Sequence, residues 1–328
     1  MLYSIVEVQN RIAEGKPLFL AGSESALSQI PKGNWIGGTI PYFMDVNGGT
    51  CSESQIFVNE VPDCALKVQF ADYTAETLPS ICKDAPENGF SFIIIPAASP
   101  AHRAYAEDAP NYEEMYLKPV VGWISGVLLS EIGRTLPKVF NGQTGKSSSE
   151  GAVVAHVTLP AGKQAELDIV NIFKQGSGDT ITFPSSSFSA DDCMVNGSRA
   201  NFAGYIARTK ADSRIPLTAD YNGSIVNVSI QSVDAEAGKV NFYAPVFAGI
   251  EYKFAAPVSD YVAAFEAGIH ADGTPATFSC NCILNYLYGD LEGKHTGGIT
   301  GPITFGEIAH QLLNQTLVRL SIREVSYS

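Results

Sequence analysis

The chain has 328 residues, of which 45% are hydrophobic and only 17% are charged, so it has enough apolar content for a large core. Its formal net charge is −13 and its Lys and Arg residues form no cluster, which argues against binding to nucleic acid or to an anionic membrane surface. The sequence shows no signal peptide, no apolar run long enough to span a bilayer, and six irregularly spaced cysteines. We therefore expect a cytoplasmic protein with reduced thiols.

The first part of the chain predicts helices and strands in alternation. The periodicity of the apolar residues gives, in chain order, a helix over 2–14, strands over 16–21, 34–40 and 65–71, a helix over 74–83, a strand over 90–96 and helical turns over 101–117. A strand–helix–strand run of this kind is typical of layered α/β or α+β architectures.

From residue 120 onward the sequence favours strands. The expected elements are strands over 120–123, 152–159, 224–233, 239–254, 277–282, 303–308 and 315–322, with helices over 198–210 and 259–269. The stretch 175–192 is rich in Gly, Ser and Asp and predicts a linker. We expect an α+β fold in which mixed or antiparallel sheets with flanking helices form two packed halves, residues 1–180 and 181–328.

Three short segments resemble one another weakly. Trp35-Ile-Gly-Gly, Gly122-Trp-Ile-Ser-Gly and Gly297-Gly-Ile-Thr-Gly each combine small residues with a strand. Matches this short also arise by chance, so the sequence alone does not establish an internal repeat.

Segments in both halves resemble the FIST sensory domain (F-box and intracellular signal transduction). The C-terminal segments with this resemblance are Phe278-Ser-Cys, Gly301 to Glu307 and Asn314-Gln-Thr-Leu. The N-terminal ones are Trp35-Ile-Gly-Gly-Thr-Ile, Phe92-Ile-Ile-Ile-Pro, Pro119-Val-Val-Gly-Trp and Lys138-Val-Phe-Asn-Gly. The resemblance covers residues 15–322 and implies an intracellular sensor of small ligands, with amino acids as suggested ligands. No output domain follows in this sequence, so we expect any signal to pass through a partner protein.

The expected binding site draws mainly on polar segments near the C-terminus. Glu307 could bind an ammonium group and Asn314 offers an amide, whereas Arg103 could hold a carboxylate and Trp123 could line the pocket. The alternatives are a solvated strand end for Glu307, a turn-forming amide for Asn314, a surface charge for Arg103 and a core position for Trp123. The complete set of expected ligand-binding residues is Cys280, Asn281, Cys282, Glu307, Asn314, Arg103 and Trp123.

Cys280 and Cys282 lie two residues apart and therefore share one face of the expected strand. Their thiols could bind Zn²⁺ with further ligands, act as a nucleophile with His295 or His310 as base, or serve as small apolar core residues. The sequence contains no typical metal-ligand spacing and no P-loop, nucleophile elbow or dinucleotide fingerprint. We therefore expect neither metal nor cofactor, and we expect a protein that binds a small polar metabolite. A thiol-dependent enzyme and a structural or partner-binding protein are the alternatives.

Overall fold

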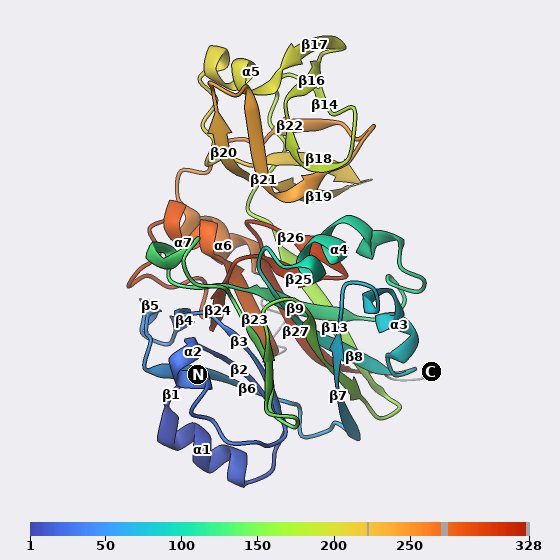
Figure 1. Ribbon diagram of the computed structural model, residues 1–328, viewed down its shortest axis with the longest axis vertical. Helices are drawn as coiled ribbons and strands as arrows, with labels where there is room; N and C mark the ends of the chain where they lie inside the picture. The colour runs from blue at the N-terminus through green and yellow to red at the C-terminus, as the bar shows by residue number, and fades with distance from the viewer. Residues whose placement is uncertain (222, 270–274, 326–328) are drawn as a thin grey trace.

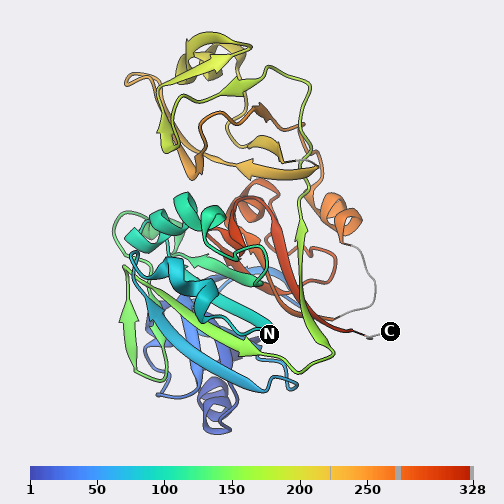
Figure 2. The same ribbon diagram turned by 90° about the vertical axis from the view of Figure 1, so that its right-hand side faces the viewer.

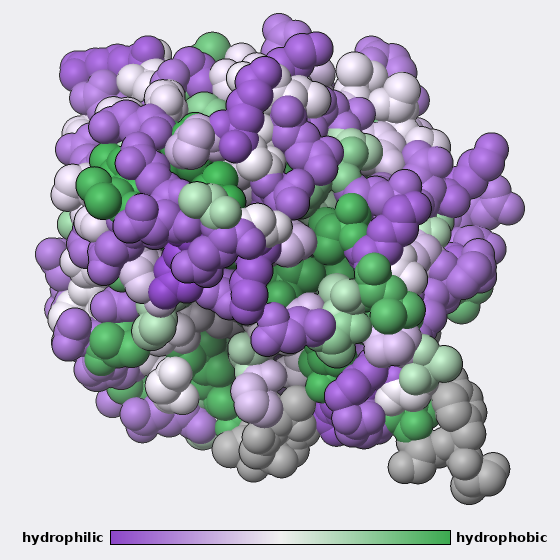
Figure 3. Space-filling view, turned by 90° about the horizontal axis from the view of Figure 1, so that it is seen from below, coloured by the Kyte–Doolittle hydropathy of each residue, from purple (hydrophilic) through white to green (hydrophobic). Residues whose placement is uncertain are grey.

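The computed structural model describes residues 1–221, 223–269 and 275–325, which form a body of mixed sheets with a lobe at one end (Figure 1). Mixed and antiparallel sheets with flanking helices confirm the expected α+β class. None of the described helices is both long and apolar enough to cross a membrane. At the end opposite the lobe, hydrophobic residues are interspersed among hydrophilic ones on the surface (Figure 3).

Outside the lobe, the α-helices and strands of the described chain repeat one order three times: strand, helix, strand, helix and four further strands. The second unit adds the short 3₁₀ helices η1, η2 and η3 to this order. The first unit contains β1 (Leu2–Ser4), α1 (Ile5–Ala13), β2 (Leu18–Gly22), α2 (Glu24–Leu27), β3 (Trp35–Thr39), β4 (Tyr42–Asp45), β5 (Gly48–Cys51) and β6 (Gln55–Glu60). The second contains β7 (Lys67–Tyr73), η1 (Leu78–Ser80), α3 (Ile81–Asp84), β8 (Gly89–Pro96), α4 (Pro100–Asp108), η2 (Ala109–Asn111), β9 (Val120–Ser125), η3 (Leu129–Glu131), β10 (Val139–Asn141), β11 (Lys146–Ser148) and β12 (Ala152–Thr158). The third contains β13 (Lys163–Val170), α6 (Tyr261–Gly268), β23 (Ala276–Cys282), α7 (Ile283–Tyr288), β24 (Gly301–Thr304), β25 (Glu307–Ala309), β26 (Gln311–Leu313) and β27 (Leu317–Glu324).

Each unit builds most of one sheet, and a hairpin from another unit adds the last two strands. Each of these sheets has six strands within the described residues. In the second unit, β8 and β9 are parallel, while β12 and then β7 pair antiparallel on the other side of β8. The hairpin β25–β26 of the third unit pairs with β9 and places Glu307 opposite Trp123. In the same way, β10–β11 completes the first sheet and β4–β5 completes the third. This cyclic exchange of hairpins ties the three units into one body.

Three glycines occupy the same place in the three parallel strand pairs. A Cβ atom added to Gly37, Gly122 or Gly301 would lie 3.0, 1.7 or 1.9 Å from the carbonyl oxygen of Leu20, Ile93 or Ser279, respectively, on the neighbouring parallel strand. Only glycine allows the backbones to approach this closely at Gly122 and Gly301. These glycines mark a structural repeat. The weak sequence similarity does not follow it residue for residue, because Trp35 is equivalent to Val120 and not to Trp123.

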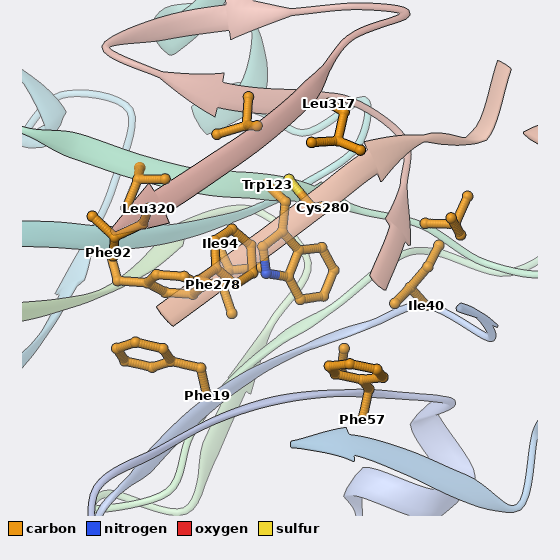
Figure 4. Packing of buried hydrophobic residues seen from close by; sticks show 14 of the residues in the cluster. Phe19, Ile40, Phe57, Phe92, Ile94, Trp123, Phe278, Cys280, Leu317 and Leu320 are labelled. Carbon is orange, nitrogen blue, oxygen red and sulfur yellow. The ribbon is translucent and has the colours of Figure 1, made fainter. Parts of the chain in front are cut away.

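Aromatic rings from the three units meet in the shared core. Phe19, Phe92 and Phe278 each come one residue before the carbonyl that faces the equivalent glycine. The rings of Phe19 and Phe92 stack at 3.9 Å, and Phe278 meets Phe92 edge-on at 4.7 Å. Figure 4 shows these rings together, with Trp123 and Cys280 in the same core. The core therefore lies where the inner faces of the three sheets converge.

Between β13 and α6, the chain leaves the body and folds as the lobe (Figures 1 and 2). The lobe contains β14 (Ile181–Thr182), β15 (Ser187–Ala190), β16 (Asp192–Val195), β17 (Ser198–Asn201), α5 (Phe202–Thr209), β18 (Leu217–Tyr221), β19 (Ser224–Val228), β20 (Ile230–Asp234), β21 (Lys239–Val246) and β22 (Tyr252–Phe254). Its own core is built around Phe183, Phe202, Phe242 and Tyr252. The expected boundary at residue 180 falls next to β14. Two sheets of the body nevertheless combine strands from both sides of that position, through the pairs β13–β27 and β9–β25.

Several expected elements change type or bounds. The helix expected over 74–83 is reduced to η1 and α3, and α3 ends shortly before Pro86, since the residue preceding a proline disfavours helical backbone. The helix expected over 198–210 is shorter and is α5. Its first four expected residues form strand β17 instead, which pairs with β16, and the side chain of Asn201 caps α5. The expected linker over 175–192 contains β14 and β15, while the strand expected over 224–233 divides into β19 and β20.

The strands expected over 224–233 and 239–254 pair with each other where β20 and β21 run antiparallel, with Val233 opposite Val240. The rest of the expected strand 239–254 divides, because β21 ends at Val246 and β22 starts only at Tyr252. The helix expected over 259–269 is present as α6, and Asp260 caps it by accepting a hydrogen bond from Ala263 N.

Candidate functional site

Glu307 lies fully buried at the start of β25, between the sheets of the second and third units. Its Oε2 accepts hydrogen bonds from Thr316 N at 3.1 Å and from Thr316 Oγ1 at 2.8 Å, and Oε1 lies 3.5 Å from Thr304 Oγ1. Burial raises the pKa of Glu307 from 4.5 to about 8, while the hydrogen bonds from Thr316 act in the opposite direction. At neutral pH the uncharged carboxylic acid therefore predominates.

The two thiols expected near this carboxyl are both present and both buried. Cys280 and Cys282 are 2% and 1% exposed, and Cys280 Sγ lies 3.7 Å from Gly122 O. Burial, followed by the charge of Glu307, raises the pKa of both thiols well above the ordinary value. Protonated, enclosed thiols do not fit a thiolate nucleophile.

The two histidines considered as bases lie in other environments. His310 Nδ1 lies 2.8 Å from Met115 O, and His295 is exposed. Within the described residues, no three His, Cys, Asp or Glu side chains are grouped so as to hold a metal ion. Nothing in the arrangement supports the pairing of either β23 thiol with a histidine base.

Asn281 belongs to a small amide pair that fixes the start of α7. Its Oδ1 accepts hydrogen bonds from Cys282 N at 2.8 Å and from Asn285 Nδ2 at 2.9 Å. The neighbouring cavity, lined by Asn281, Cys280 and Thr296 among others, has a volume of about 10 Å³. This is the space of a single water molecule, so a metabolite does not fit there without rearrangement.

Asn314 lies in the connection between β26 and β27, where the lobe meets the body. Asn227 of the lobe donates from Nδ2 to Asn314 O at 3.1 Å and to Gln315 O at 3.4 Å. Ser229 Oγ donates to Gln315 Oε1 at 2.7 Å. The next residue, Thr316, donates to Glu307, so hydrogen bonds continue from the lobe to the buried carboxyl.

Of the remaining two expected residues, Trp123 lies opposite Glu307 in the core and Arg103 lies elsewhere. Trp123 is 1% exposed and packs in the shared core (Figure 4). Arg103 lies on the outer helix α4 with a 70% exposed side chain, 3.7 Å from Glu107 and 5.6 Å from the ring centroid of Phe188 in the lobe. The structure thus brings together Cys280, Cys282 and Glu307, whereas Arg103 lies outside this cluster.

A cleft that the sequence does not suggest opens in the second unit. It has a volume of about 370 Å³. Its lining comes from the end of β7, the start of α4, the hairpin β10–β11 and the start of β12: Asp72, Tyr73, Thr74, Ala75, Glu76, Pro100, Val139, Asn141, Lys146, Ser147, Ser148, Glu150, Gly151, Ala152 and Val153. We refer to it as the β7–β10 cleft.

The walls of the β7–β10 cleft are held by hydrogen bonds between its own residues. Asn141 Nδ2 donates to Asp72 Oδ1 at 2.9 Å, which links β10 to β7. Ser148 Oγ accepts from Glu150 N at 3.1 Å and from Gly151 N at 3.0 Å, which fixes the connection to β12. Ordered walls that carry polar groups are what a pre-formed ligand site requires.

A buried polar chain supports the cleft from behind. Tyr73 Oη donates to Asp84 at 2.9 Å and lies 2.8 Å from His156 Nε2, and His156 Nδ1 lies 2.8 Å from Ser91 Oγ. Burial lowers the pKa of His156 to about 4, so the imidazole is neutral at neutral pH. Ser91 is fully buried, which makes this Ser–His pair a brace within the sheet and not an accessible nucleophile.

The comparison with known proteins places the chain in a family without giving a function. A search of curated proteins found no match. The model of a family of unknown function, DUF6976, matches residues 3–323. Because this match spans nearly the whole chain, the protein belongs to the DUF6976 family.

Proposed function

We propose that this protein binds a small polar metabolite, such as an amino acid, in the β7–β10 cleft. The observation that carries the proposal is a cleft of about 370 Å³ with ordered polar walls. Clefts of roughly 300–1,000 Å³ are typical of small-molecule sites. The cluster around Glu307 is already filled by its own side chains, so we place the ligand in the cleft.

The charges that line the cleft suit a zwitterionic or polyfunctional ligand. Carboxylates of Asp72, Glu76 and Glu150 could pair with a ligand ammonium group, while Lys146 and the hydroxyl of Ser147 could hold a carboxylate. A sensory role, in which a partner protein receives the signal, is consistent with the resemblance to FIST domains. That resemblance stays a prediction, because the family match carries no function.

The test is a thermal-shift screen against amino acids, organic acids, nucleotides and sugars, followed by calorimetric titration of each ligand that raises the melting temperature. A ligand at a hundred times its Kd stabilises the folded state by about 2.7 kcal/mol, which a melting curve resolves. Ser147→Trp fills the cleft from the exposed strand β11, and Gln143→Trp places the same side chain in the neighbouring exposed turn, outside the lining.

We expect Ser147→Trp to abolish binding and Gln143→Trp to retain it. Binding that survives in Ser147→Trp, or the absence of any ligand across the whole screen, would refute the proposal.

A further inference from the structure

The three-fold repetition gives the β7–β10 cleft a counterpart in the third unit. Phe140 pairs with Gly37 and Ile308 pairs with the equivalent Gly122, so Phe140 and Ile308 are equivalent. The residues one position earlier, Val139 of the cleft and Glu307, are therefore equivalent as well. Because Val139 pairs with Ser148 and Glu307 pairs with Leu313, the hairpins match strand for strand.

The connections that follow the two hairpins also correspond. Residues 149–151 lead from β11 to β12 and residues 314–316 lead from β26 to β27, with three residues in each case. Glu150 is therefore equivalent to Gln315. Ala152 and Leu317 begin the strands that follow these connections, and they pair with Tyr73 and Val170, respectively. The residues after Tyr73 and Val170, which are Thr74 and Asn171, are therefore equivalent. Two lining positions of the cleft, Thr74 and Glu150, thus have exact counterparts in the third unit.

In the third unit, the lobe occupies the space between these counterparts. The Asn227 amide hydrogen-bonds to the Asn171 side chain in both directions, at 3.0 and 3.1 Å, and its Nδ2 also reaches Gln315 O. Ser229 adds a hydrogen bond to Gln315 Oε1. Asn227 and Ser229 are 1% exposed, so the third unit shows this place filled by a polar group that donates N–H.

The second unit keeps the same frame but leaves the place open and changes its charge. Glu150 stands where the third unit has the neutral Gln315, and Asp72 and Glu76 add two further carboxylates to the lining. Lys146 is the basic side chain among the lining residues, so acidic groups predominate around the cleft. A positively charged N–H donor in this place would bind the Glu150 carboxylate more strongly than a neutral one.

We propose that the β7–β10 cleft recognises a ligand ammonium group, which it binds between Thr74 and Glu150 where the third unit holds the Asn227 amide. This inference rests on the proposed function, and it names the chemical class of the ligand. Ser149 O would accept an N–H donor of the ligand, as Asn314 O does from Asn227 in the third unit. Glu150 O, the equivalent of Gln315 O, already accepts a hydrogen bond from Ala101 N at 3.2 Å, so the Glu150 side chain and not its carbonyl would meet the ammonium group. Thr74 would stand where the third unit has Asn171, and its hydrogen bond to the Glu76 side chain brings a second carboxylate to this place.

The test compares matched pairs of ligands by calorimetric titration: each amino acid against the 2-hydroxy acid that has a hydroxyl in place of the ammonium group. We expect the amino acid to bind at least about tenfold more tightly, which is the factor that ~1.4 kcal/mol from a charge-assisted hydrogen bond produces. Glu150→Gln, which copies the third unit, should weaken amino-acid binding by a similar factor and reduce the difference within each pair. The matched control, Glu113→Gln, removes an exposed carboxylate outside the cleft and should change neither.

The outcomes separate this inference from the proposed function. Equal affinity within the pairs, with binding still abolished by Ser147→Trp, would overturn the ammonium assignment and leave the cleft as the site. An unchanged preference for the amino acid in Glu150→Gln would also overturn the assignment. Binding that is insensitive to Ser147→Trp would overturn both.

Discussion

Replacing Glu307 with Gln keeps the shape of a buried side chain and removes its titration. Burial raises the pKa of Glu307 from 4.5 to about 8. Between these two pH values, Glu307 is protonated in the folded state and ionised in the unfolded state. The stability that the protonated form contributes is therefore fully present below about pH 4.5 and is lost as the pH rises through about 8. Since one unit of pKa shift corresponds to ~1.4 kcal/mol, we expect Glu307 to lower the free energy of unfolding by roughly 5 kcal/mol across this range.

The measurement is urea unfolding of the native protein and of Glu307→Gln over this pH range, with the difference in free energy of unfolding plotted against pH. Other titrating groups cancel in the difference, so we expect Glu307→Gln to gain ~1.4 kcal/mol relative to the native protein for each pH unit between the two pKa values. The exposed substitution Glu113→Gln serves as the control and should show no such slope. A difference that stays constant with pH would refute the reasoning, since it would mean that Glu307 titrates alike in the folded and unfolded states.

Three further predictions follow from packing and burial. Gly122→Ala would put a Cβ atom 1.7 Å from Ile93 O and should cost at least ~3 kcal/mol or prevent folding, whereas Gly178→Ala meets nothing within 4 Å; equal melting temperatures would contradict the strand packing. Iodoacetamide should label the exposed Cys51 of the native protein well before the two buried thiols of β23, as read by mass spectrometry, and fast labelling of the β23 thiols would show that the cluster is accessible. Asn227→Ala removes the amide that holds the connection 314–316, so hydrogen exchange there should lose ~1–3 kcal/mol of protection while the first unit is unaffected; unchanged exchange would show that the lobe does not hold this connection.

Part of the fold could be predicted from the sequence, because apolar periodicity and helix caps favoured the same helices and strands that the tertiary structure contains. The strand expected over 90–96 is confirmed. The helix expected over 2–14 is confirmed from Ile5 to Ala13 with Ser4 and Glu7 forming its capping box, whereas Leu2–Ser4 pairs with β6 as strand β1. The glycine segments at Gly37 and Gly122 were visible as similar but were too short to establish a repeat. The hairpin exchange could not be predicted, because it pairs strands of different units and depends on long-range packing.

The sequence anticipated the candidate site only in part. The segments with Cys282 and Glu307 were expected to converge, and the structure does bring them together. The β7–β10 cleft was missed, because its walls combine ordinary Ser, Asn and Glu residues from strands far apart in the chain. Its frame also changes chemistry between units: the position of Val139 in the second unit is taken by Glu307 in the third, so no shared motif marks the cleft.

The most direct test of the account is hydrogen exchange by mass spectrometry, with and without the tightest ligand from the screen. If the ligand binds in the β7–β10 cleft, exchange should slow in residues 72–76 and 146–153, with little change in residues 276–284 and 305–317. Protection confined to residues 276–284 and 305–317 would contradict the account, because it would place the ligand in the buried cluster around Glu307.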